Sequence, residues 1–177
     1  MSRQKGITLL EVLFTLSLIF ILVSAIFLVY IAVLRGWDQL GRRNDLHEKL
    51  NFAVERIVRD VRNANAISVP AGTHSLRFTL NESGTNNSYI YYLYNASDSW
   101  VPNFNQASYD LRRAGPLAGG INGTFTYGSG DLIITNLKPP SGNTSITISG
   151  NYAIVNLVSQ SSTETLNVRG YVRPRNL

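Results

Sequence analysis

The residue whose type and position most suggest chemistry is Glu11, an acidic side chain at the start of a long apolar run. Residues 12–34 include no charged residue, and their polar members are Thr15, Ser17, Ser24 and Tyr30. A carboxylate in hydrocarbon costs up to ~3 kcal/mol, so it needs a partner or a place near the interface. A nearby α-amino group would supply a partner, and the first turn of a helix also favours negative charge. Glu11 is therefore a candidate for an ion pair, with a location among lipid headgroups as the alternative.

Other reactive residues are too scattered to predict catalysis or a metal centre. The two histidines, His47 and His74, fall in an expected helix and in a loop, which does not suit a shared metal ion. The glycine-rich segments at 119–120 and 128–130 lack the strand–turn–helix context of a phosphate loop or a nucleophile elbow. We therefore expect a protein that is not an enzyme and that uses no cofactor and no metal.

The apolar run must itself position Glu11, and its length predicts a membrane span. As a helix with a rise of ~1.5 Å per residue, residues 12–34 cover about 35 Å, enough for a bilayer core of ~30 Å. The apolar core of a secretory signal peptide is shorter, at about 7–15 residues. Basic residues flank both ends of the run, so their distribution does not decide which side of the membrane the rest of the chain occupies.

The overall charge does not indicate a dedicated nucleic-acid surface. The 177 residues carry a formal net charge of +5 and contain no cysteine. Arginines between residues 42 and 62 alternate with acidic residues, as on a solvated helix. Nucleic-acid binding is the less favoured interpretation.

Residues 35–66 are expected to continue as an amphipathic helix. Apolar residues recur at steps of three and four and form one apolar stripe, which is Leu46, Leu50, Val54 with Ala53, Ile57, Val61 and Ala64. The other face offers pairs at i,i+4 spacing, which are Asp45/Lys49, Glu55/Arg59 and Arg56/Asp60. We expect this helix to pack on the rest of the chain and to end near Ala66.

Residues 67–177 have the short β-prone runs separated by turn residues that are typical of an antiparallel sheet. Short strands are expected at 76–80, 89–94, 109–113, 124–127, 132–135, 145–148, 152–158 and 165–172, with residues 81–88 as a turn-rich connection. Alternation places Tyr89 and Tyr91 on one face and Tyr92 and Tyr94 on the other, where sheet packing is the expected role. The predicted fold is α+β, with a long N-terminal helix packed on a mostly antiparallel head.

The segment from Lys5 to Leu13, Lys-Gly-Ile-Thr-Leu-Leu-Glu-Val-Leu, resembles the processing site of the bacterial type IV pilin and pseudopilin family. The resemblance implies that residues 1–6 are a leader, that a prepilin peptidase cuts after Gly6, and that it methylates the new amine of Ile7. Glu11 would then be the fifth mature residue and pair with the Ile7 amine of an adjacent subunit. It also implies a head outside the cytoplasm, an inner-membrane assembly platform as a partner, and a filament built with other pilins.

Weaker similarities point to a subtype. Residues 50–62, the tyrosine-rich strand, Leu111-Arg112-Arg113 and residues 172–176 look like the W-type minor pilins and the J-type minor pseudopilins of type II secretion. The absence of cysteine agrees, since major pilins often carry a C-terminal disulfide loop. The expected division is leader 1–6, transmembrane and filament-core helix 7–34, stalk helix 35–66 and β-rich head 67–177. The alternative is a single-pass anchored binding protein that keeps its leader.

Overall fold

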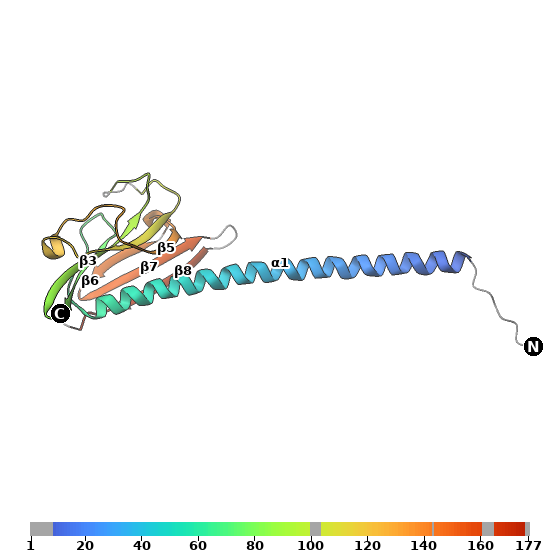
Figure 1. Ribbon diagram of the computed structural model, residues 1–177, viewed down its shortest axis with the longest axis horizontal. Coiled ribbons are helices and arrows are strands. Elements are labelled where there is room, and N and C mark those ends of the chain that lie inside the picture. Colours follow the sequence, from blue (N-terminus) through green and yellow to red (C-terminus); the bar gives the residue numbers. More distant parts are fainter. Residues whose placement is uncertain (1–8, 100–103, 143, 161–164, 176–177) are drawn as a thin grey trace, which may run out of the picture. The chain divides into compact units, whose positions relative to one another are not determined.

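The computed structural model describes residues 9–99, 104–142, 144–160 and 165–175, which form one long helix and an eight-stranded sheet (Figure 1). The helix is α1 (Leu9–Arg62). The strands are β1 (Ala64–Ser68), β2 (Leu76–Glu82), β3 (Thr85–Tyr94), β4 (Tyr109–Ala114), β5 (Asp131–Leu137), β6 (Ser145–Ser149), β7 (Tyr152–Gln160) and β8 (Thr165–Val172). Their order is β1-β2-β3-β4-β5-β7-β6, with β8 also paired to β7, and every pairing is antiparallel. Two short 3-10 helices, η1 (Gly120–Asn122) and η2 (Pro140–Gly142), lie in connections. The predicted α+β fold is confirmed.

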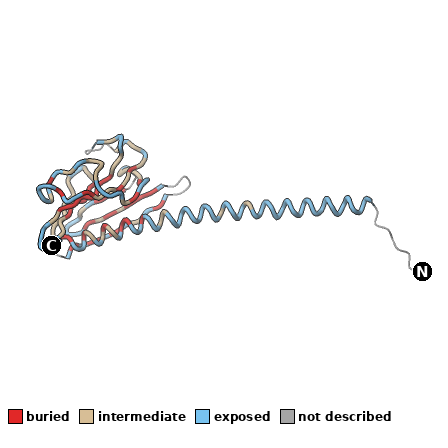
Figure 2. The backbone as a smooth tube through the Cα atoms, in the orientation of Figure 1, coloured by how far each residue is buried: buried red, intermediate tan, exposed pale blue. Residues whose placement is uncertain are grey.

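The chain divides into two compact units, Met1–Asn44 and Asp45–Leu177, and α1 contributes residues to both. In the first unit nearly all residues of α1 are exposed (Figure 2), and they include most of the large apolar residues from Leu9 to Leu40. By its length and composition α1 qualifies as a membrane-spanning helix. An apolar helix without a protein core around it is the kind of surface that lipid or other helices cover.

In the second unit, α1 packs on the sheet through the predicted stripe. Leu50, Ala53, Ile57 and Val61 are fully buried and share one core with residues of the sheet (Figure 2). The backbone of β8 approaches the helix closely, because a Cβ added to Gly170 would lie 2.7 Å from a Val54 methyl group. The spacing of three and four therefore predicted the packed face of the helix correctly.

The end of α1 differs from the expectation. The helix was expected to reach Ala66, but it stops at Arg62, and β1 begins at Ala64. Ala64 is fully buried and pairs with Leu80 of β2. Pairing with a strand that lies later in the sequence sets the end of the helix, and this pairing overrides the local helix propensity.

The connection between β2 and β3 is shorter than the sequence suggests. The sequence suggested a long turn over residues 81–88. In the structure β2 extends to Glu82 and β3 begins at Thr85. Ser83 and Gly84 form the turn with φ values of 53° and 85°. Positive φ at both central residues is the geometry of a tight hairpin whose twist matches the strands. The hairpin fixes the register of β3, in which Tyr89 and Tyr91 flank the Phe78 ring of β2 at centroid distances of 5.7 and 5.3 Å.

The opposite face of β3 and β4 has a smaller core of its own. Ile90, Tyr92, Ala114 and Leu117 are buried there, and Tyr94, Phe125 and Tyr127 pack against them. The alternation of the tyrosine-rich strand between two faces is thus confirmed.

The predicted strand at 124–127 is wrong. Within this segment only Thr124 forms a bridge, to Ala118, while the rings of Phe125 and Tyr127 lie 4.8 and 5.6 Å from that of Tyr92. Gly130 turns the chain back with φ of +92°, where a Cβ would lie 2.2 Å from the Arg113 carbonyl oxygen. The segment therefore covers the sheet face with its rings and does not extend the sheet.

Candidate functional site

The N-terminal candidate residues are only partly within the described structure. Gly6 and Ile7 lie outside the described residues. Glu11 lies in the first turn of α1, where the helix dipole favours its negative charge, and it is exposed. Next to it, Leu9 and Leu10 are 82% and 78% exposed. A carboxylate is thus presented at the tip of an exposed apolar surface.

The polar side chains within the apolar part of α1 are hydrogen-bonded inside the helix. Thr15 Oγ1 donates to the Val12 carbonyl at 2.9 Å, and Ser17 Oγ donates to the Leu13 carbonyl at 2.8 Å. Ser24 Oγ donates a hydrogen bond to the Phe20 carbonyl at 2.7 Å. Groups satisfied within the helix need no water, which hydrocarbon does not supply. These hydroxyls are therefore compatible with a membrane environment.

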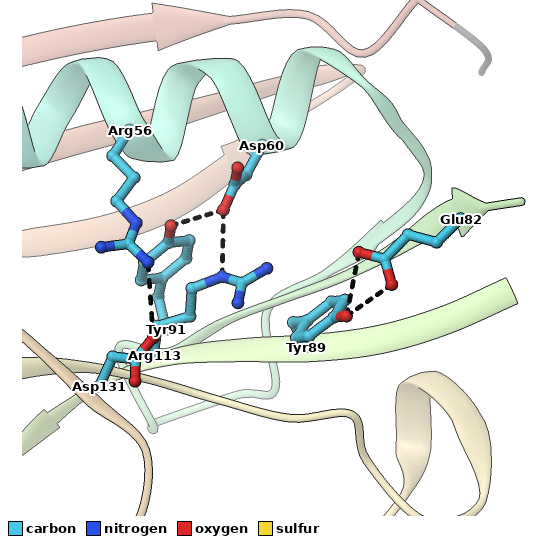
Figure 3. Close-up of polar contacts among 7 residues, drawn as sticks. All are labelled: Arg56, Asp60, Glu82, Tyr89, Tyr91, Arg113 and Asp131. Carbon is cyan, nitrogen blue, oxygen red and sulfur yellow. Dashed lines mark hydrogen bonds and ion pairs between the residues drawn. The ribbon is translucent and has the colours of Figure 1, made fainter.

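In the Asp45–Leu177 unit, Asp60 of α1 is the centre of a half-buried polar network (Figure 3). Its Oδ2 accepts hydrogen bonds from the Tyr91 hydroxyl at 2.7 Å and from Arg113 Nε at 3.1 Å. The Asp60 and Arg113 side chains are only 14% and 18% exposed. The Arg113 guanidinium also lies over the Tyr89 ring, 4.0 Å from its centroid. One carboxylate of the helix thereby binds both β3 and β4.

Two further contacts extend the network (Figure 3). Arg56 Nη2 lies 3.6 Å from Asp131 Oδ2 at the start of β5. The Tyr89 hydroxyl donates to both carboxylate oxygens of Glu82, at 3.0 and 2.8 Å. Asp60 and Arg56 thus join α1 to β3, β4 and β5, whereas the Glu82 contact joins β2 to β3.

The pairs expected along the helix surface are partly wrong. Asp45 and Lys49 do pair, at 2.6 Å. Arg56 and Asp60 do not pair with each other, because each reaches a different strand. Across the described part of the chain no ion pair joins Glu55 to Arg59. A signal for Asp60 was present in the sequence, since it directly precedes Val61 of the buried stripe and so borders the packed face.

Two buried tyrosines, Tyr91 of this network and Tyr109 of β4, predict a loss of stability at high pH. Burial, with Asp60 as the next cause, raises the pKa of Tyr91, and burial with a hydrogen bond to Asp98 raises the pKa of Tyr109 to about 12. A folded-state pKa above the unfolded value of about 10 gives stability that is complete below pH ~10 and lost as the pH rises toward the folded pKa. We expect urea unfolding of the full chain in micelles to show this decline, and Tyr91→Phe with Tyr109→Phe to flatten it.

Tyr152→Phe is the control for this experiment, because it removes the same hydroxyl from a half-exposed tyrosine that belongs to neither buried core. A double variant that lost stability above pH ~10 as steeply as the parent would contradict the assignment to Tyr91 and Tyr109.

The remaining candidate chemistries receive no support from the geometry. Within residues 9–99, 104–142, 144–160 and 165–175, no three His, Asp or Glu side chains gather in a way that could hold a metal ion. The His74 ring packs edge-on against Phe104, with centroids 5.2 Å apart. The tyrosine rings of β3 are largely buried in the two cores, so they do not form an open stacking surface.

Comparison with known proteins supports the N-terminal candidate. Residues 1–27 match the family model of the prokaryotic N-terminal methylation motif. The matched range includes Gly6, Ile7, Glu11 and residues 12–27 of the apolar run. No curated protein and no solved structure matches the chain.

Proposed function

We propose that this protein is a minor pilin or pseudopilin, a structural subunit of a type IV pilus, DNA-uptake or type II secretion filament. The observation that carries the proposal is the methylation motif over residues 1–27, which supports a type IV pilin-like protein. The fold agrees, because a long apolar N-terminal helix packed on an antiparallel sheet is a pilin-like architecture. A motif of this class favours a structural subunit over an enzyme.

In the proposed pathway the chain is first a membrane protein. Its leader, residues 1–6, lies in the cytoplasm, residues 7–34 cross the inner membrane, and the head lies outside the cytoplasm. A prepilin peptidase cuts the Gly6–Ile7 bond and methylates the Ile7 amine. Exposed apolar side chains along residues 9–34 support both stages, since lipid covers them before assembly and neighbouring helices cover them afterwards.

Glu11 gives assembly a driving force in this proposal. Its carboxylate is costly in hydrocarbon at about 2.5–3.5 kcal/mol, and a positively charged Ile7 amine of an adjacent subunit offsets this cost. The contact is heterologous, because the amine of one subunit meets the carboxylate of the next. Repeated without closure, such contacts generate a helical filament.

The minor subtype rests on the sequence similarities to W-type minor pilins and J-type minor pseudopilins. The absence of cysteine from all 177 residues is consistent with it. Minor subunits of this kind are thought to prime filaments, which would place this protein in few copies beside other pilins.

The intact mass of the protein isolated from its native membrane tests the proposal. We expect a chain that lacks Met1–Gly6 and carries one added methyl group on Ile7. A Gly6→Val variant is the matched control, because a branched side chain at the cleavage position should leave the leader in place. Native protein that retains Met1–Gly6 and has no methyl group would reject a processed pilin and favour a single-pass anchored binding protein.

A further inference from the structure

A groove of about 550 Å³ lies between the last turns of α1 and the C-terminal tail of the chain. The Arg175 N–H donates to the Arg62 carbonyl at 3.0 Å, which joins the tail to the end of the helix. On the same side Gly170 brings β8 into close contact with Val54 and Val58. The groove is thus a built feature of the Asp45–Leu177 unit, held by one backbone hydrogen bond and by the packing of β8 against two valine side chains of α1.

Within the part of the chain that the structure describes, three arginines of this groove have no counterion. Arg59, Arg62 and Arg175 line it and are exposed, and among the described residues their side chains have neither an ion pair nor a hydrogen bond. Arg56, which also lines the groove, is already paired with Asp131. The acidic member of the lining is Glu55, so the groove keeps an excess of positive charge.

The helix dipole accounts for only part of this cluster. Its negative end favours basic residues in the last turn, which explains Arg59 and Arg62 without any ligand. It does not explain Arg175, which comes from the opposite end of the sequence and is positioned by its backbone hydrogen bond to the helix. Guanidinium groups from two elements around one concavity form a typical arrangement for recognising carboxylates.

The groove also has apolar lining. Phe52 is 60% exposed at its edge, and Val58 is half-buried within it. A ligand that presents carboxylates next to apolar side chains matches both parts of this lining, whereas a nucleic acid would need a longer basic tract. We propose that the groove binds an acidic, partly apolar peptide segment of a partner protein. If the proposed function holds, that partner is a neighbouring subunit.

Peptide binding to the full chain in non-ionic detergent micelles tests this site. The probe is a fluorescent peptide that alternates glutamate and leucine, followed by anisotropy. We expect Arg59→Gln, Arg62→Gln and Arg175→Gln together to weaken binding by about tenfold or more, because three charge-assisted contacts are lost. Arg173→Gln is the matched control, since Arg173 is an exposed arginine of the same tail that does not line the groove, and it should change binding by less than about twofold.

A second variant should act in the opposite direction. Glu55→Gln removes the negative charge from the lining and is expected to tighten binding of the acidic peptide by about two- to threefold. A gain in affinity cannot arise from misfolding, so this arm remains informative if the triple variant is unstable.

Three results would overturn the inference. They are equal binding of a peptide with glutamine in place of glutamate, no response to the arginine substitutions, and tighter binding of an oligonucleotide that depends on the same arginines. The last result would assign the groove to nucleic acid. Peptide binding does not require cleavage at Gly6–Ile7, so failure here would leave the proposed function standing, and retention of the leader would leave the groove standing.

Discussion

Asp60→Ala is expected to lower the free energy of unfolding of the head by about 3–5 kcal/mol, the largest stability effect of any single polar substitution that we predict. The variant leaves Arg113, whose side chain is only 18% exposed in the structure, without its Asp60 carboxylate, and it leaves the Tyr91 hydroxyl without its acceptor. A charge that is desolvated and unpaired costs more than the lost contact itself. Urea unfolding of the full chain in micelles, followed by the near-UV circular dichroism of the head tyrosines, measures the change.

Asp45→Ala is the matched control for Asp60. It removes the same side chain from the same helix, but Asp45 and its partner Lys49 are each 58% exposed. A surface pair of this kind contributes less than about 0.5 kcal/mol. Similar losses in the two variants would show that the network around Asp60 does not hold the helix on the sheet. A double variant, Asp60→Leu with Arg113→Met, should recover part of the loss because no unpaired charge remains.

Glu11→Ala is expected to abolish incorporation of the protein into filaments while leaving its amount in the membrane unchanged. Removing a carboxylate makes the apolar segment easier to insert, so the membrane form gains stability if anything. In the proposed filament, the Ile7 amine of the adjacent subunit would lose its carboxylate partner. We expect the fraction of the protein in sheared filaments, or cross-linked to other pilins, to fall by more than tenfold.

Two variants define the role of the charge at this position. Glu11→Gln keeps the size of the side chain and should fail like Glu11→Ala, whereas Thr15→Ala, one turn later, should assemble normally. The Thr15 hydroxyl already donates a hydrogen bond to the Val12 carbonyl, so it does not need a partner in another subunit. Normal assembly of Glu11→Gln would contradict a role for the ion pair and would leave only the shape of the side chain as a requirement.

The sequence predicted those parts of the fold that depend on periodicity. The stripe from Leu50 to Val61 is the buried face of α1, and the alternation of β3 places Tyr91 and Tyr92 in separate cores. Both predictions rest on the fixed geometry of a helix or a strand, which does not depend on what lies across from it. The N-terminal motif could be recognised for a related reason, because its residues are contiguous.

The features that the sequence did not predict depend on contacts between distant residues. The end of α1 at Arg62 follows from the pairing of Ala64 with Leu80, and the residues near Ala64 in the sequence do not indicate that pairing. The sequence predicted Asp60 to be a surface residue, because its partners Tyr91 and Arg113 are 31 and 53 residues away along the chain. The groove needs Arg175 beside Arg62, two residues that come together only when the tail returns to the helix.

The hydrogen bond from Arg175 to Arg62 also has a consequence for labelling the protein. A tag or fluorescent protein joined close to Arg175 would lie beside the end of α1 and would compete with a ligand of the groove. The Ser83–Gly84 turn offers a better insertion point, because it is an exposed hairpin tip whose neighbours Asn81, Glu82 and Thr85 are also exposed. A label in that turn would report on the position of the head without adding mass to the tail.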